Sequence, residues 1–87
     1  MEKYQFRFKP TGEKSFNKLS KSVQDQIIKK LEYFLKADDP LGFAEYLTDR
    51  QVGEYRFRIG KYRIITEVTG KIIFILLAGH RRNIYKK

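Results

Sequence analysis

Residues 55–65 read YRFRIGKYRII, and this stretch decides the fold. Gly60-Lys61 is predicted to form a two-residue turn, so the residues on either side of it form a β-hairpin. Side chains alternate between the two faces of a strand, so this register also decides which residues share a face. The predicted pairs are Ile59 with Tyr62, Arg58 with Arg63, Phe57 with Ile64, and Arg56 with Ile65.

The two faces of the predicted hairpin differ in chemistry. One face gathers the apolar and aromatic side chains Tyr55, Phe57, Ile59, Tyr62 and Ile64. The other face carries Arg56, Arg58 and Arg63, although like charges opposed across strands are destabilising. Glu67 is the only nearby strand acid expected to offset them. A sequence that accepts this penalty indicates an anion-binding site. In the alternative, the arginines extend into solvent and pair with Glu54, Glu67 or the Asp38-Asp39 loop.

The segments around the hairpin complete a small α+β domain spanning residues 1–87. Alternation around Tyr4, Phe6 and Phe8 indicates a strand, and apolar residues at three- and four-residue spacing indicate two helices. Residues 41–50 are predicted to hold at most one helical turn. The order β-α-α-β-β-β predicts a helical hairpin packed on one face of a largely antiparallel four-stranded sheet. The predicted elements are a strand over 3–9, helices over 11–19 and 22–36, strands over 55–59, 62–68 and 72–78, and a basic tail over 79–87.

The last predicted strand is apolar on both faces. Residues 72–77 read IIFILL, so neither alternating set contains a polar side chain. A strand of this kind lies in the centre of a sheet and is covered on both sides. Alternatively, one of its faces stays open until a partner chain covers it.

Composition limits the protein to a few classes. The 87 residues are 41% hydrophobic and 15% aromatic, which suffices for one domain with a small core. No cysteine is present, so disulfides and thiolate metal sites are excluded. No apolar run is long enough to span a membrane, and no signal peptide is recognised at the start. We therefore expect a soluble cytoplasmic protein.

The positive charge is concentrated in the second half of the chain. Residues 1–49 contain nine basic and eight acidic residues, whereas residues 50–87 contain ten basic residues and only two acids, for a total of +9. Six of the seven arginines lie in this second half. Arginine presents a planar fork that matches phosphate, so a nucleic-acid partner is expected. Lys29 and Lys30 on the second helix either contact RNA phosphates or form a solvated face.

Three segments together resemble a known family. They are IIKKL at 27–31, GEYRFRIGKYRII at 53–65 and GHRRNIY at 79–85. In these segments the chain resembles the RelE/ParE-like toxins of toxin–antitoxin pairs, and is closest to the RelE-type messenger-RNA interferases. The resemblance covers nearly the whole chain.

The resemblance implies a type II toxin that acts as a ribosome-dependent endoribonuclease. Such an enzyme cuts messenger RNA in the ribosomal A site, where a ribose 2′-hydroxyl attacks the adjacent phosphate, and it needs no metal or other cofactor. The implied partners are a RelB-like antitoxin, the ribosome and messenger RNA, in a higher-order toxin–antitoxin complex. ParE-like members poison DNA gyrase without cutting RNA, and an inactive relative that only binds ribosomal RNA is a third reading.

The resemblance also implies a set of site residues. Arg63 and Arg81 match phosphate-binding arginines, and Tyr85 matches a tyrosine that stacks on or orients the substrate. Arg56 stands where the best-known interferases have lysine, and an arginine is a poor proton donor. The expected catalytic residues are Arg56, Arg58, Arg63, His80, Arg81 and Tyr85. The expected RNA-binding residues are Lys61, Arg82, Lys86, Lys87, Lys29 and Lys30.

The proton-transfer group is not decided by the sequence. A pair of histidines is impossible because the chain has only one. The candidates are His80, Tyr85 and Glu67. The flanking arginines are expected to lower the pKa of His80 and favour its neutral form, which can act as a base. In the alternative, His80 caps or packs the end of the strand and Tyr85 closes the edge of the core.

Overall fold

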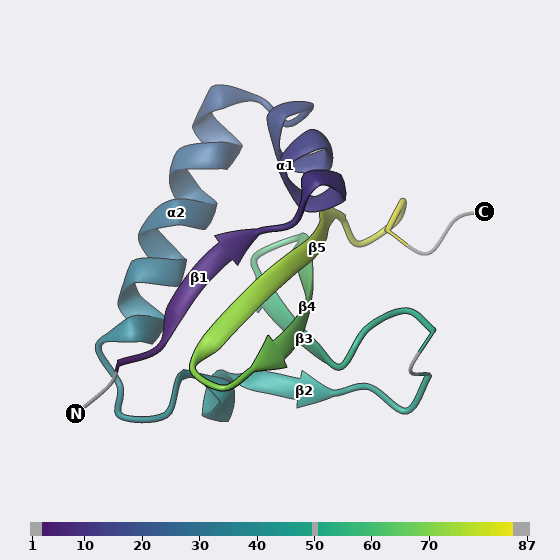
Figure 1. The fold of residues 1–87 in the computed structure, drawn as a ribbon. Coiled ribbons are helices and arrows are strands. Elements are labelled where there is room, and N and C mark those ends of the chain that lie inside the picture. Colours follow the sequence, from purple (N-terminus) through teal and green to yellow (C-terminus); the bar gives the residue numbers. More distant parts are fainter. Residues whose placement is uncertain (1–2, 50, 85–87) are drawn as a thin grey trace.

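The computed structural model describes residues 3–49 and 51–84, which form two helices on one face of a twisted sheet (Figure 1). The predicted α+β class is therefore confirmed. Among the described residues, no helix has the length and apolar character needed to cross a membrane. The elements are β1 (Gln5–Phe8), α1 (Pro10–Asn17), α2 (Lys21–Leu35), the 3₁₀ helix η1 (Pro40–Phe43), β2 (Ala44–Tyr46), β3 (Tyr55–Ile59), β4 (Tyr62–Thr69) and β5 (Ile72–His80).

The sheet has five strands in the order β1-β5-β4-β3-β2, rather than the four predicted. β1 runs parallel to β5, and the other neighbours are antiparallel. The additional strand is β2, which has only three residues and pairs with β3 at the sheet edge. Three residues are too few to show a periodic pattern, so the sequence did not reveal this strand. The helical turn expected in this region is η1.

The predicted hairpin register is confirmed at all four pairs. Gly60 has a φ of +58°, a backbone conformation that side-chain-bearing residues rarely adopt, and it opens the turn. Phe57, Ile59 and Ile64 are almost completely buried on the helical side of the sheet. The ring of Phe34 on α2 stacks on Phe57 with 5.2 Å between the ring centroids. Burial of the apolar face against α2 therefore holds the hairpin in this register.

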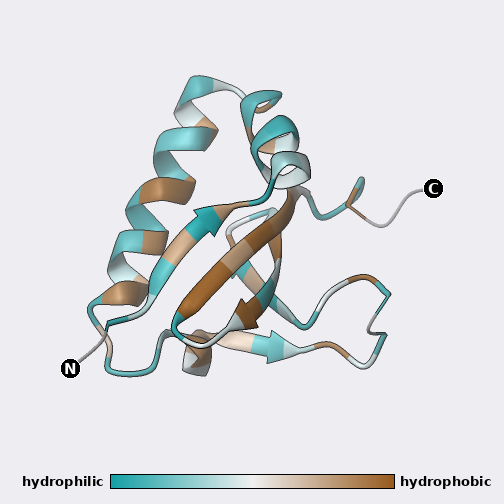
Figure 2. Ribbon diagram, viewed as in Figure 1, coloured by the Kyte–Doolittle hydropathy of each residue, from teal (hydrophilic) through white to brown (hydrophobic). Residues whose placement is uncertain are grey.

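β5 is an interior strand between β1 and β4, as one of the two interpretations of its sequence expected. It forms the longest apolar stretch of strand in Figure 2. Ile73, Ile75 and Ala78 are buried under the helices. On the other face Phe74 and Leu77 are only half-buried. β5 is therefore covered by helices on one face only, so the prediction that both of its faces are covered is met only in part.

An irregularity in the pairing of β4 with β5 shifts the alternation of faces along β5. Ile65 pairs with Leu77, but the next pair is Thr66 with Ile75, so Leu76 has no partner in the register. Thr66 lies on the same face of β4 as Ile64 and is completely buried, and its hydroxyl donates to the Tyr55 carbonyl oxygen at 3.2 Å. This bulge is a local departure from alternation that the sequence pattern does not show.

Gly12 on α1 lets the helix approach β5 closely. A Cβ atom at this position would overlap the backbone carbonyl of Ile75. The clash involves main chain, so neither partner can rotate away, and we expect Gly12→Ala to destabilise the fold by about 1–3 kcal/mol. Thermal unfolding should show a melting temperature lower by roughly 4–8 °C for each kcal/mol.

Gly42→Ala is the matched control, because a Cβ at Gly42 has no atom within 4 Å. Its melting temperature should stay close to that of the unsubstituted protein. Equal stability of the Gly12 and Gly42 variants would contradict the close packing of α1 on β5.

Candidate functional site

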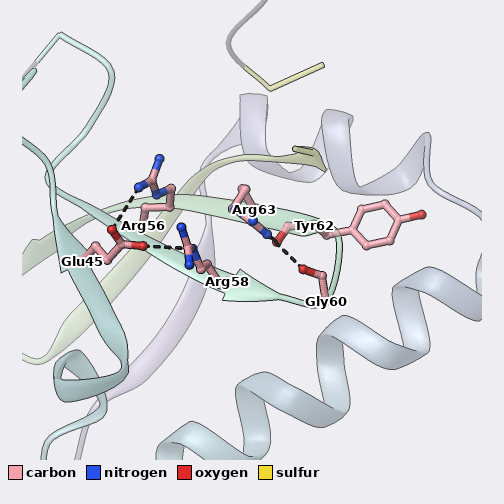
Figure 3. A network of polar contacts seen from close by, with 6 residues as sticks. All are labelled: Glu45, Arg56, Arg58, Gly60, Tyr62 and Arg63. Atoms are coloured by element: carbon pink, nitrogen blue, oxygen red, sulfur yellow. Dashed lines mark hydrogen bonds and ion pairs between the residues drawn. The ribbon is translucent and has the colours of Figure 1, made fainter. Parts of the chain in front are cut away.

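Three arginines lie on the face of the β3–β4 hairpin that points away from the helices. We call Arg56, Arg58 and Arg63 the arginine cluster. Arg58 and Arg63 are directly opposite each other in the register, and Arg56 precedes them on β3 (Figure 3). The side chain of Arg58 is 63% exposed, whereas that of Arg56 is 22% exposed. The structure thus brings together the three positive charges that the register predicted.

Glu45 on β2 is the acid that offsets two of these charges. Its Oε2 lies 3.0 Å from Nη2 of Arg56, and its Oε1 lies 3.0 Å from Nε of Arg58. The hydrogen bond from Arg56 lowers the pKa of the Glu45 carboxyl, and the charges of the arginine cluster add to this effect against partial burial. Glu45 is therefore a carboxylate at neutral pH. Glu45 was not predicted as the counter-charge, because the sequence pattern does not reveal β2.

Glu67, the expected counter-charge, lies elsewhere on the same face of the sheet. It pairs with Phe74 in the register, and its Oε1 is 4.0 Å from Nζ of Lys9. The expectation that Glu67 offsets the arginine cluster is therefore wrong. Of the other acids considered, Glu54 accepts a hydrogen bond from the Val68 backbone N–H at 2.8 Å.

Arg63 is held by main-chain oxygens at the hairpin turn. Its Nη1 donates to the carbonyl oxygen of Gly60 at 3.0 Å and to that of Tyr62 at 2.9 Å. These bonds fix the guanidinium beside the turn rather than letting it extend into solvent (Figure 3). A fixed, cationic group of this kind is suited to bind a phosphate oxygen with little loss of side-chain entropy.

The segment after β5 folds back against the hairpin turn. The Arg81 N–H donates to the carbonyl oxygen of Lys61 at 2.8 Å, so the two residues are adjacent. The Asn83 and Ile84 N–H groups donate to the His80 carbonyl oxygen, and the Ile84 side chain is buried. The exposed residue Arg81 therefore lies next to the Gly60-Lys61 turn, to which Arg63 is also hydrogen-bonded.

His80, the last residue of β5, has structural contacts of its own. Its Nδ1 accepts a hydrogen bond from the Arg82 N–H at 3.1 Å, and its ring meets that of Tyr62 edge to face at 5.5 Å. Partial burial lowers the pKa of His80, and the charges of Arg82, Arg81, Lys61 and Arg63 lower it further. The predicted direction of this shift is confirmed. Because Nδ1 accepts the hydrogen bond from Arg82, the neutral ring carries its hydrogen on Nε2, and a second proton can bind only at Nδ1 in place of the Arg82 N–H.

The remaining predicted site residues divide into two groups. Tyr85, Lys86 and Lys87 lie outside the described residues. Lys29 and Lys30 lie on α2, on the helical side, and with Gly60 they line a cavity of about 400 Å³. Lys30 also sits over the ring of Tyr33 at 4.7 Å. The two lysines are therefore separated from the arginine cluster by the sheet.

Metal ligands do not gather in the part of the chain that the structure describes. Within residues 3–49 and 51–84, no group of three or more histidine or acidic side chains is placed to hold a metal ion. The ionisable groups described at the site are the guanidinium groups of the arginine cluster, the Glu45 carboxylate and the His80 imidazole. This set can bind and polarise a phosphate, and it includes two groups that accept protons.

The sequence matches the family model of the ParE toxin of type II toxin–antitoxin systems over residues 6–85. The chain belongs to this family. It is therefore a toxin of the RelE/ParE superfamily, as its motifs suggested. No curated protein sequence matches it significantly.

Two solved structures share the fold of this toxin. One is the toxin–antitoxin complex RelBE2 from Mycobacterium tuberculosis, with a TM-score of 0.73 and 24% identity over 92% of this chain and 100% of that chain. The other is an arginine-to-alanine variant of the Escherichia coli toxin RelE in the free state, with a TM-score of 0.69 and 22% identity over 97% of this chain and 92% of that chain. At these identities the likeness establishes the fold of the toxin.

The lowered pKa of His80 predicts how the stability of the toxin depends on pH. The unfolded chain binds a proton at the ordinary histidine pKa of about 6.5, whereas the folded chain binds it only at lower pH. The contribution of His80 is therefore fully present above about pH 6.5 and is lost as the pH falls through the folded pKa. Urea denaturation between roughly pH 5 and pH 7.5 should show this decline.

The His80→Asn variant isolates the effect, because asparagine offers an acceptor oxygen but does not titrate in this range. Its free energy of unfolding should fall less steeply than that of the unsubstituted toxin over the same pH interval. Identical slopes for the two proteins would contradict the lowered pKa of His80.

Proposed function

We propose that this toxin is a ribosome-dependent endoribonuclease that cleaves messenger RNA in the ribosomal A site. The observation that carries the proposal is the arginine cluster, with Arg58 directly opposite Arg63 and with Arg81 brought to the same hairpin turn. Opposed guanidinium groups on one strand pair repel each other, and an anion that binds between them relieves this repulsion. A bent RNA backbone supplies such an anion at every phosphate.

The proposed reaction is attack of a ribose 2′-hydroxyl on the adjacent phosphate. The P–O5′ bond breaks as the new P–O2′ bond forms, giving a 2′,3′-cyclic phosphate and a 5′-hydroxyl. The reaction needs in-line geometry and stabilisation of charge on the phosphorus oxygens, and the arginine cluster with Arg81 provides both. It also needs a group that accepts the 2′-hydroxyl proton and a proton for the departing 5′-oxygen, which the protonated acceptor can return. The lowered pKa values keep Glu45 as a carboxylate and His80 as a neutral ring at neutral pH, and His80 can take the proton on Nδ1 once that atom releases the Arg82 N–H.

The proposed partners follow from the same face of the sheet. An RNA-cutting toxin must be inhibited by its antitoxin, and one structural relative is a toxin–antitoxin complex. A RelB-like antitoxin with an acidic segment is complementary to the arginine cluster and to the half-buried side of β5. A toxin that acts on messenger RNA and the ribosome is proposed to work in the cytoplasm, and its complex with antitoxin is proposed to be of higher order.

Gyrase poisoning is the second candidate function. The matching family model is that of the ParE toxin, and a ParE-like poison would bind a topoisomerase without cutting RNA. A third reading is an inactive relative that binds ribosomal RNA. Primer extension on translated messages, run beside a supercoiling assay with gyrase, separates the three. Cuts within codons support the nuclease, and intact messages with inhibited gyrase support the poison.

Loss of a phosphate-binding arginine should abolish cleavage but preserve the fold. We expect Arg63→Ala and Arg81→Ala each to lower the cleavage rate by 100-fold or more, the order of magnitude for removing one donor to a developing charge, about 10²–10³. Primer extension on translated messages measures this rate. Because Arg63 points away from the helices, the melting temperature of the Arg63→Ala variant should stay close to that of the unsubstituted toxin.

Arg7→Ala is the matched control, since Arg7 lies on β1 at the far edge of the sheet and contacts the Gln5 side chain. Its cleavage rate should equal that of the unsubstituted toxin. Cleavage that survives Arg63→Ala, or that falls equally in the Arg7 variant, would refute the assignment of phosphate binding to the arginine cluster.

Removal of the Glu45 charge should strengthen RNA binding. The carboxylate occupies the two guanidinium groups, so an RNA phosphate must compete with it. Glu45→Gln removes this competing charge, and we expect it to lower the dissociation constant for a non-cleavable 2′-O-methyl oligonucleotide several-fold, a modest effect because the charge is screened by solvent. Fluorescence anisotropy measures the constant.

Glu67→Gln makes the same change of charge at a site paired with Lys9 rather than with the arginine cluster. It should leave the dissociation constant closer to that of the unsubstituted toxin. An equal effect of the two substitutions would show that only net charge matters, and it would contradict local competition by Glu45.

A further inference from the structure

The chain leaves β5 in a closed turn that ends on a buried side chain. Arg81, Arg82 and Asn83 are exposed, whereas the next residue, Ile84, is only 8% exposed. The turn is closed because the N–H groups of Asn83 and Ile84 both donate to the His80 carbonyl oxygen, at 2.8 and 3.0 Å. Within residues 81–84, Ile84 is thus the one apolar side chain and the one that is buried.

Ile84 lies at the end of β5, on the face of the sheet that carries the arginine cluster. Gly79 pairs with Arg63 in the register, so a side chain at position 79 would stand on the same face as Arg63. A Cβ atom placed there would lie 3.2 Å from Cδ1 of Ile84, so Ile84 occupies the space that the glycine leaves. The buried cluster under the helices does not include Ile84. Its burial therefore serves this turn rather than the main core.

The same turn holds Arg81 at the hairpin. The Arg81 N–H donates to the Lys61 carbonyl oxygen at 2.8 Å, which ties the start of the turn to the hairpin that carries Arg63. Hydrogen bonds within a single turn do not keep it closed in water, because ordering the backbone costs more than so few bonds return. Burial of the Ile84 side chain supplies stabilisation at the other end of the turn. Arg81 consequently lies between two attachments.

We propose that Ile84 is a positioning residue, which holds Arg81 beside Arg63 by packing its side chain against Gly79. This inference rests on the proposed binding of RNA phosphates by these arginines, and it adds a residue that acts through Arg81 without contacting RNA. While the turn is closed, the backbone of Arg81 is ordered before RNA arrives, which reduces the entropy lost on binding. Gly79 is part of the device, because a larger side chain would fill the space of Ile84.

The first test uses the toxin without RNA. Hydrogen exchange measured by NMR reports how often the turn opens, through the N–H groups of Asn83 and of residue 84. Ile84→Ala removes the contact with Gly79, so both groups should exchange several-fold faster than in the unsubstituted toxin. Ile84→Leu keeps the side-chain volume and should retain slow exchange. Gly79→Val suits a strand but fills the space of Ile84, so it should accelerate exchange as Ile84→Ala does.

The second test asks whether the turn acts through Arg81. Fluorescence anisotropy gives the association constant of a 2′-O-methyl oligonucleotide, whose logarithm falls with the logarithm of the salt concentration by about 0.7 for each phosphate contact of a single strand. Arg81→Ala should therefore reduce the slope by about 0.7, the contribution of one contact. Ile84→Ala should reproduce most of this reduction, although it changes no charge. The double variant should bind as Arg81→Ala does, because both substitutions remove the same contact.

Ile72→Ala is the matched control, because Ile72 begins β5 at the end far from the arginine cluster and is also partly buried. It should leave the exchange of the turn and the salt slope unchanged. Unchanged exchange in Ile84→Ala would overturn the inference. So would effects of Ile84→Ala and Arg81→Ala on RNA binding that add, or a salt slope that Arg81→Ala does not change.

Failure of this inference can be told apart from failure of the proposed function. If the unsubstituted toxin and Ile84→Ala cut messages on the ribosome at equal rates, only the positioning role of Ile84 is refuted. If messages remain intact while Ile84→Ala opens the turn and shares the salt slope of Arg81→Ala, the positioning role stands and the nuclease is refuted.

Discussion

The register of the β3–β4 hairpin is the constraint on which the rest of the structure depends. Phe57 and Ile64 face each other and are completely buried, while Arg58 and Arg63 face each other on the opposite side. A shift by one residue would expose the first pair and bury the second. Burying unpaired guanidinium groups costs several kcal/mol each, so the same register that forms the core also displays the arginine cluster.

The arginine cluster persists in the folded toxin because each charge is held in its own way. Glu45 neutralises part of the charge of Arg56 and Arg58, and backbone carbonyls hold Arg63. These contacts position the guanidinium groups before any ligand arrives, which reduces the entropy lost on binding. The carboxylate is also displaceable, since it is itself half-exposed. The cluster is therefore both ordered and open to an external anion.

The sequence predicted the hairpin and its faces because those features are local. A two-residue turn and strict alternation determine the register without help from distant residues. β2 and Glu45 could not be predicted in this way, because three residues show no period and their pairing depends on the rest of the sheet. The unpaired position at Leu76 has the same origin, as it arises only when β4 and β5 are aligned. The arginine cluster was thus predicted from the sequence, whereas the carboxylate that offsets it, Glu45, was not.

Side-chain NMR of the arginines during titration with a 2′-O-methyl oligonucleotide tests most directly whether the arginine cluster binds RNA phosphates. The Nε–H signals of Arg58 and Arg63 should shift in a saturable manner, while that of Arg7 at the far edge of the sheet should remain in place. Saturable shifts at Arg7 with unchanged signals for Arg58 and Arg63 would contradict the account.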